Sequence, residues 1–133
     1  MYISPPCKSF SIAAAHNRPQ LRTKAYPEGQ PDIPHAWVNY IQRHNSMART
    51  TIRLIKAAHN ANTAWGVENP ADRGEKDSPA YWEKHQHQGT LWDILRMHGI
   101  NQKQQDGEDI RAHEHTIPMC TFGADHQKYT TIW

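Results

Sequence analysis

The sequence predicts a single α/β domain, and the order of its apolar segments is the main reason. Residues 1–4 read as the end of a buried strand, because they run directly into Pro5 and Pro6, which end the pairing of a strand. A helical stripe of apolar residues follows between about residues 34 and 60, and a short apolar run at 63–68 predicts a second strand. A strand, a helix and another strand in this order are typical of α/β proteins.

The long helix has the clearest periodic signal. Ala48, Ile52 and Ile55 fall on one helical face, and Asn45 or Ser46 is a suitable cap if the helix breaks early. The segment before it, residues 16–36, contains four prolines and many polar residues. We expect a long loop there, of the kind that is usually functional or mobile.

The second half of the chain predicts smaller elements. Residues 91–97 favour a short helix that ends at Gly99. Residues 117–122 and 130–133 favour two strands joined by a turn at Gly123. Residues 115–133 are therefore expected to supply the last strands of one domain that spans the whole chain, residues 1–133.

Composition and charge set limits on the class of protein. The chain has 133 residues, of which 37% are hydrophobic, with five Trp and five Tyr to build a small core. Its formal net charge of +2 gives no strong basic field. Ten His residues can add positive charge in mild acid, which permits contact with nucleic acid without arguing for it.

Cysteine usage and hydropathy indicate an intracellular protein. Cys7 and Cys120 are too few for a disulfide framework, and free thiols are the rule in a reducing compartment. No segment approaches the ~20 apolar residues of a membrane span, and the N-terminus lacks the character of a signal peptide. We expect a cytoplasmic or nuclear location and no membrane partner.

The first chemical signal is the segment Ser-Pro-Pro-Cys-Lys-Ser-Phe-Ser at residues 4–11. A strand ends, two prolines stiffen the turn, and the thiol of Cys7 follows, at the strand end where α/β proteins place their active sites. Lys8 and backbone N–H groups of the following turn would stabilise a thiolate. The alternative interpretation is a buried, inert cysteine beside a proline turn.

Two weaker signals follow along the chain. Glu68 and Asn69 end the second predicted strand, so a carboxylate again lies at a strand end, with a solvated surface Glu as the alternative. In the tail, Lys128 and Thr130 are suited to contact backbone phosphates, although a plain β-hairpin explains the same residues.

The chain resembles the cytosine-C5 DNA methyltransferases in three places. Residues 4–11 resemble the nucleophile motif of that family, and Val-Glu-Asn-Pro at 67–70 resembles its second catalytic motif. Cys-Thr-Phe-Gly and Lys-Tyr-Thr-Thr-Ile-Trp, both within residues 120–133, are similar to a segment of members from phages and mobile elements. The three islands occur in the family's order and span nearly the whole chain.

The resemblance implies a covalent mechanism of DNA methylation. Cys7 would add to carbon 6 of cytosine, which makes carbon 5 nucleophilic, and Glu68 would contact ring N3 and the amino group while Asn69 steadies the motif. S-adenosylmethionine would donate the methyl group, and the base would leave the duplex to react.

The resemblance also assigns further contacts to the substrate. The 16–36 segment occupies the place of the family's mobile DNA-closing loop, and positive charges in such a loop bind backbone phosphates. The expected substrate contacts are Pro5, Pro6, Ser9, Arg18, Arg22, Lys24, Lys128 and Thr130. Pro5 is also expected to border the cofactor.

Several features depart from the family pattern. The Gly-rich turn that binds S-adenosylmethionine is not found before Cys7, so the resemblance implies a partial Rossmann-like fold without its N-terminal cofactor-binding half. Ser4 stands where the family commonly has Gly, Pro70 stands where Val is common, and Arg111 is a weak stand-in for an arginine motif beside the base. An inactive remnant that binds DNA or protein is therefore an alternative function.

Other functions compete with this one. Six His and Cys side chains make a small zinc-binding protein a further alternative, although their spacing does not match a zinc finger; they are His85, His87, His113, His115, Cys120 and His126. Four aromatic residues could form a surface that stacks on bases, but core packing explains them better; they are Tyr81, Trp82, Trp92 and Trp133. The N-methyltransferases use an aromatic residue after Pro-Pro, where this chain has Cys7.

Overall fold

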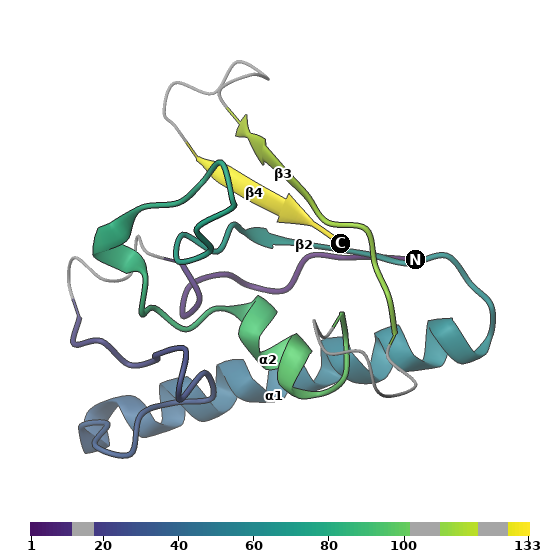
Figure 1. The fold of residues 1–133 in the computed structure, drawn as a ribbon. Coiled ribbons are helices and arrows are strands. Elements are labelled where there is room, and N and C mark those ends of the chain that lie inside the picture. Colours follow the sequence, from purple (N-terminus) through teal and green to yellow (C-terminus); the bar gives the residue numbers. More distant parts are fainter. Residues whose placement is uncertain (12–17, 102–109, 120–127) are drawn as a thin grey trace.

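A computed structural model describes residues 1–11, 18–101, 110–119 and 128–133 of the chain. The elements in chain order are β1 (Tyr2–Ile3), α1 (His35–Asn60), β2 (Gly66–Pro70), the 3-10 helix η2 (Glu83–His85), α2 (Leu91–Met97), β3 (His115–Pro118) and β4 (Tyr129–Ile132). The fold is mixed α/β, as the sequence predicts, with one four-stranded sheet and two α-helices (Figure 1).

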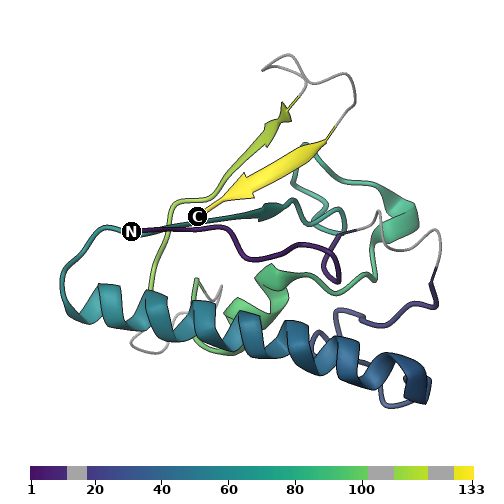
Figure 2. The same ribbon diagram turned by 180° about the vertical axis from the view of Figure 1, so that it is seen from behind.

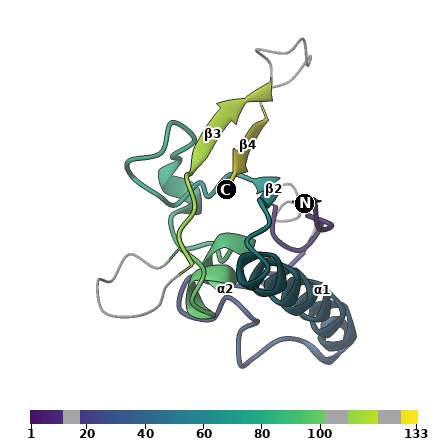
Figure 3. The ribbon, with the colours of Figure 1, turned by 90° about the vertical axis from the view of Figure 1, so that its right-hand side faces the viewer.

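The strand order β1-β2-β4-β3 makes the sheet mixed. β1 runs parallel to β2, whereas β4 is antiparallel to both β2 and β3. The two helices lie together on one side of β2, and the β3–β4 hairpin projects away from them (Figures 1 and 2). Viewed from the side, α1 and α2 lie next to each other beneath the β1–β2 part of the sheet (Figure 3).

The hydrophobic core lies between the helices and this part of the sheet. α1 contributes Ala48, Ile52 and Ile55, as its periodicity predicts, and Val67 of β2 faces the same space. Other core residues come from the segment after β1, from α2 and from the ends of the later segments; they are Phe10, Leu91, Trp92, Ile94, Leu95, Ile100, Ile110 and Trp133. The core therefore joins the turn after β1 to α1, β2, α2 and the last residue of the chain.

α1 is a continuous helix, so the prediction of an early break with a cap at Asn45 or Ser46 is wrong. Asn45 is buried within the helix, and its Nδ2 donates to the carbonyl oxygen of Glu28 at 2.7 Å. This hydrogen bond ties the preceding loop to the helix. The loop ends at Pro34, two residues earlier than predicted, because the helix begins at His35.

The second helix agrees with its predicted bounds. Thr90 caps α2 and forms a capping box with Asp93, so the first backbone N–H groups find side-chain partners. Gly99 follows the helix with φ of +84°, a conformation that favours glycine and ends the helix.

β2 begins later than predicted and continues through Pro70. The N–H of Val67 donates to the carbonyl oxygen of Trp133, and the N–H of Ala71 donates to that of Tyr129. The N–H groups of odd-numbered residues therefore point to β4, and the backbone nitrogens of even-numbered residues point to the β1 side. β1 ends its pairing with β2 at Ile3, which leaves the nitrogen of Pro70 facing no paired strand. A missing N–H at that position therefore costs no ladder hydrogen bond.

The C-terminal hairpin is predicted correctly in type, but β3 begins at His115 and ends at Pro118. Cys120 and the Gly123 turn lie outside the described residues. Among the residues described, no helix has the length and apolar character needed to cross a membrane.

The core position of Ile55 gives a first prediction. Ile55 is fully buried, so Ile55→Ala should lower the free energy of unfolding by about 2–5 kcal/mol. Its exposed neighbour is the matched control, since Lys56→Ala should change stability by no more than about 0.5 kcal/mol. Urea unfolding followed by Trp fluorescence measures both, and equal effects would contradict this description of the core.

Candidate functional site

The first two sequence motifs lie side by side in the structure. β1 and β2 are parallel neighbours, with Tyr2 opposite Gly66 and Ile3 opposite Val67. Ser4 directly follows β1, and Glu68 lies within β2, one residue beyond the last position paired with β1. The hydroxyl of Ser4 donates to Glu68 Oε2 at 2.7 Å. The carboxyl ends of adjacent parallel strands are where open α/β sheets bind their ligands.

The side chain of Asn69 connects the two motifs. Its side chain is only 1% exposed, and Nδ2 donates to the carbonyl oxygen of Pro5 at 2.9 Å. This bond holds the proline turn against the end of β2. The Asn69 side chain therefore positions the segment that leads to Cys7.

Cys7 begins a tight turn. Its carbonyl oxygen accepts hydrogen bonds from the N–H groups of Phe10 and Ser11, each at 2.9 Å. Phe10 is 3% exposed and belongs to the core, whereas Cys7 is half-buried and carries a free thiol. The core thus anchors the far end of the turn while Cys7 stays in partial contact with solvent.

The two expected proline contacts differ in exposure. Pro5 is buried and Pro6 is exposed. Because Pro5 is held by Asn69, it serves the shape of the turn, and Pro6 is the proline of this pair that a substrate can reach.

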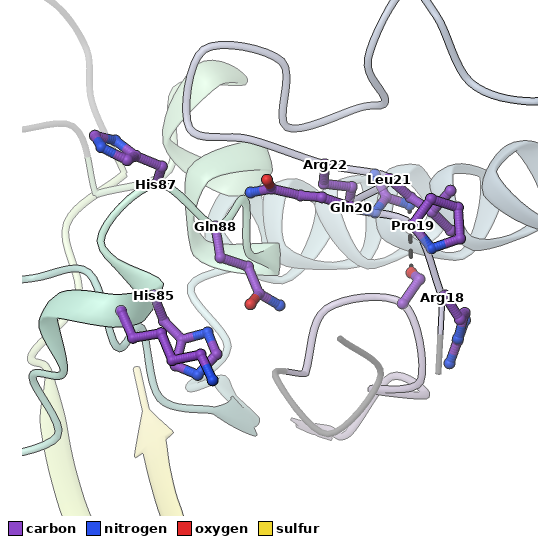
Figure 4. A pocket seen from close by; sticks show the side chains of 10 residues that line it. Arg18, Pro19, Gln20, Leu21, Arg22, His85, His87 and Gln88 are labelled. Carbon is purple, nitrogen blue, oxygen red and sulfur yellow. Dashed lines mark hydrogen bonds between the residues drawn. The ribbon is translucent and has the colours of Figure 1, made fainter. Parts of the chain in front are cut away.

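A pocket of about 270 Å³ adjoins this turn (Figure 4). Ser9 provides one wall, residues 18–22 a second, and residues 84–88 a third. Cys7 and Glu68 do not line it. The pocket thus adjoins the first of the two sequence motifs, with Ser9 as the shared residue.

The predicted cations have three different environments. Arg18 stacks on the ring of Tyr40, with its guanidinium carbon 4.7 Å from the ring centroid, and donates to the carbonyl oxygen of Lys8 at 3.1 Å. Arg22 is 2% exposed, and burial lowers its pKa to about 10 despite the opposing charge of Glu28. Both arginines line the pocket.

Lys24 has a structural role. Its Nζ lies 2.5 Å from Asp72 and 3.4 Å from Asp93, which ties the loop to α2. Burial lowers the pKa of Lys24, but the two carboxylates outweigh that effect and leave it above its usual value. The expectation that Lys24 contacts phosphates is not supported, because internal carboxylates already neutralise its charge.

The two expected contacts in the tail also differ. Lys128 is exposed just before β4 and is accessible to a substrate. Thr130 is 3% exposed, so the expectation that its hydroxyl contacts DNA is not supported.

The proposed zinc ligands do not converge in the described residues. His85 is buried, and His87, His113 and His115 are exposed. No group of three or more His, Cys, Asp or Glu side chains suited to a metal ion occurs within residues 1–11, 18–101, 110–119 and 128–133. Cys120 and His126, two of the proposed ligands, lie outside those ranges.

The aromatic residues divide between core and surface. Trp92 and Trp133 are buried, with ring centroids 4.6 Å apart, as core packing predicts. Trp82 is 47% exposed and lies edge-on to the ring of His85 at 4.9 Å.

The third wall of the pocket is not predicted from the sequence. His85 and His87 are predicted there only as possible metal ligands, whereas in the structure they line the pocket with Lys84 and Gln88. Gly89 is the local signal, because a Cβ atom there would lie 2.6 Å from the carbonyl oxygen of Thr23. Only glycine allows the two segments to approach this closely.

No family model matches the sequence, and no curated protein or solved structure matches it either.

The Asn69–Pro5 hydrogen bond gives a second prediction. Asn69→Ala leaves the Pro5 carbonyl without its side-chain donor in a buried position, which should cost about 1–3 kcal/mol of unfolding free energy. Asn39→Ala is the matched control, because Asn39 is exposed on α1 and alanine is the better helix former. Chemical unfolding compares the two, and an unchanged midpoint for Asn69→Ala would contradict this role.

His44 gives a third prediction, concerning pH. Its ring lies 4.3 Å from Tyr40 and 6.3 Å from Phe10, and burial lowers its pKa. The carbonyl of Tyr40 opposes that shift, and nearby arginines add to it. Protonation is therefore more costly in the folded protein than in the unfolded chain, so stability should fall as pH drops through the ordinary histidine pKa of about 6.5.

The test compares the native chain with His44→Gln. Urea unfolding at pH 8 and pH 5.5 should show a larger loss of stability on acidification for the native chain than for the variant. Equal losses in the two proteins would show that His44 does not carry the effect.

Proposed function

We propose that this chain is part of a cytosine-C5 DNA methyltransferase, with Cys7 as the nucleophile and Glu68 as the carboxyl group that contacts the base. The observation that carries the proposal is the parallel pairing of β1 with β2. It brings the hydroxyl oxygen of Ser4 to 2.7 Å from Glu68 Oε2, and Cys7 lies three residues after Ser4. Two motifs that are distant in the sequence thus meet at one edge of the sheet.

The four-stranded mixed sheet is compatible with part of a Rossmann-like methyltransferase fold. In such a fold β1 and β2 would belong to the parallel portion, and the β3–β4 hairpin would supply its antiparallel end. The side of β1 away from β2 pairs with no strand of the described residues. Further parallel strands of a complete fold would add at that edge.

The chemistry follows from the two side chains. The thiolate of Cys7 forms a bond to carbon 6 of cytosine, and the displaced electron pair makes carbon 5 nucleophilic. Glu68, held by the hydroxyl of Ser4, contacts ring N3 and the amino group and favours the protonated ring. Carbon 5 then takes up a proton from solvent. Loss of the original carbon 5 proton to water returns an electron pair to the ring, which reforms the double bond and expels the thiolate.

No Gly-rich turn follows β1 or β2 in the described residues, so these residues do not by themselves fit S-adenosylmethionine. When bound, S-adenosylmethionine would supply a methyl group to carbon 5 in place of the solvent proton.

DNA is the proposed substrate, and three cations are available to its backbone. Lys8 follows the nucleophile directly, Arg18 donates to the carbonyl of Lys8, and Lys128 is exposed beside β4. Phosphate contacts of this kind orient a strand without reading its sequence. A second candidate function is binding of DNA without catalysis, which the exposed cations Lys8 and Lys128 favour because phosphate contacts need no nucleophile.

The fourth prediction tests the step that needs only this chain. Addition of a thiolate to carbon 6 makes the carbon 5 hydrogen exchangeable with solvent. The protein should therefore release tritium from DNA that contains 5-tritiated cytosine, without any methyl donor. Cys7→Ser should abolish release, and Glu68→Gln should slow it by about 10²–10⁴-fold, the usual contribution of a general acid or base.

Cys120→Ser is the matched thiol control and should leave release unchanged. DNA binding without tritium release would overturn the catalytic proposal and favour the binding remnant. A second measurement addresses the cofactor: DNA with 5-fluorocytosine should give a stable covalent adduct with Cys7 only when S-adenosylmethionine also binds.

A further inference from the structure

The pocket beside the nucleophile turn has walls that are fixed to one another. The N–H of Lys24 donates to the carbonyl oxygen of His87 at 3.0 Å, and that of Gly89 donates to the carbonyl oxygen of Arg22 at 3.4 Å. The Arg22 guanidinium also donates to the hydroxyl of Ser9 at 3.3 Å, the bond drawn in Figure 4. Three segments that are distant in the sequence therefore form one built cavity.

The lining of this pocket is positive and contains no carboxylate. Arg18, Arg22 and Lys84 carry its permanent charges, and His85 and His87 stand on the wall opposite the arginines (Figure 4). Gln20, Gln88 and Ser9 add neutral donors from all three walls. Such a set of donors and positive charges fits an anion better than a cation.

The buried guanidinium of Arg22 is the strongest single observation. Its hydrogen bonds go to two neutral oxygens, the carbonyl of Pro27 and the hydroxyl of Ser9, and its Nε has no hydrogen-bond partner in the described residues. No carboxylate of those residues lies within ion-pair distance of it. Glu28 attracts this charge only from beyond ion-pair distance. A buried charge with no carboxylate in direct contact is costly, so an anion in the pocket would relieve that cost.

Lys24, two residues after Arg22, is a partly buried cation in a different environment. Its ammonium group is neutralised by Asp72 and Asp93. The contrast indicates that the positive charge of Arg22 is left for a ligand. Burial also lowers the pKa of Arg22, which is the shift that a bound anion would oppose.

We propose that this pocket binds a phosphate group, either of a DNA strand or of a free nucleotide. Arginine presents its N–H groups in a planar fork that matches phosphate oxygens, and hydroxyl and amide donors complete the set. The volume of about 270 Å³ lies just below the ~300–1,000 Å³ of drug-sized ligand sites, which suits a phosphate with its attached sugar.

The inference stands on the pocket and does not depend on the methyl-transfer proposal. If that proposal also holds, the position of Ser9, two residues after Cys7, places a phosphate of the reacting strand next to the nucleophile turn. The strand would then be fixed on one side of the base that reacts.

The fifth prediction uses matched ligands. In calorimetric titrations, deoxycytidine 5′-monophosphate should bind at least about tenfold more tightly than deoxycytidine, since charge-assisted hydrogen bonds to the phosphate account for the difference. Lys84→Gln and Arg18→Gln, both at the accessible side of the pocket, should each weaken binding of the monophosphate about fivefold. Lys56→Gln, on the exposed face of α1, is the charge-matched control and should have no effect.

Duplex and single-stranded oligonucleotides distinguish the two sources of phosphate. If a DNA strand is the ligand, Lys84→Gln should reduce the slope of log affinity against log salt by about 0.9, the value for one lost phosphate contact. Binding of the monophosphate that responds to the pocket variants, without a change in the DNA slope, identifies a free nucleotide.

Pocket variants that behave like Lys56→Gln with every ligand would overturn the inference. Arg22→Gln is informative only if its urea unfolding curve shows a folded protein, so the two accessible variants carry the test. Cys7→Ser should keep phosphate binding while it loses tritium release, which separates failure of this inference from failure of the proposed catalysis.

Discussion

The parallel pairing of β1 with β2 is the interaction on which the rest of this structure depends. Only a few residues form it, yet it fixes where the chain turns after Ile3 and places Ser4 beside Glu68 of β2. Asn69 reinforces the pairing from inside the fold, because its buried amide donates to Pro5. A one-residue slip of β1 would turn its side chains to the other face and separate Ser4 from Glu68.

The core extends this constraint to the loops. Phe10 lies in the core at the far end of the Cys7 turn, and the Arg22 guanidinium lies 4.5 Å from the Phe10 ring. The 18–34 segment is therefore packed against the turn, with Lys24 paired to α2 and Asn45 bonded to the Glu28 carbonyl. Ion-paired side chains of this segment, such as Lys24, hold the shape of the site. The proposed phosphate contacts are therefore made by the residues that line the positive pocket.

The positive pocket adjoins the turn that carries the proposed nucleophile. Cys7 follows the end of β1, Glu68 lies within β2, and the pocket lies beside the Cys7 turn, with Ser9 in its wall. A base and a phosphate of one nucleotide chain would require two such neighbouring sites of different chemistry. In the proposed reaction, a thiol and a carboxyl group would serve the ring, and arginine, lysine and amide groups would serve the phosphate.

The sequence by itself determined the α/β class, the long helix and the bounds of α2, because periodicity and capping are local signals. It also predicted the strand that ends before Pro5, but it placed Glu68 and Asn69 at a strand end, whereas β2 continues through Pro70. It did not determine that Asn45 ties a loop to the helix, that Pro70 stays within β2, or that Lys24 and Thr130 are used inside the fold. Those outcomes depend on which segments meet in space. The pocket is the clearest case, since Ser9, Arg22 and His85 come from three separate segments, and only the close approach at Gly89 and the shared core bring them together.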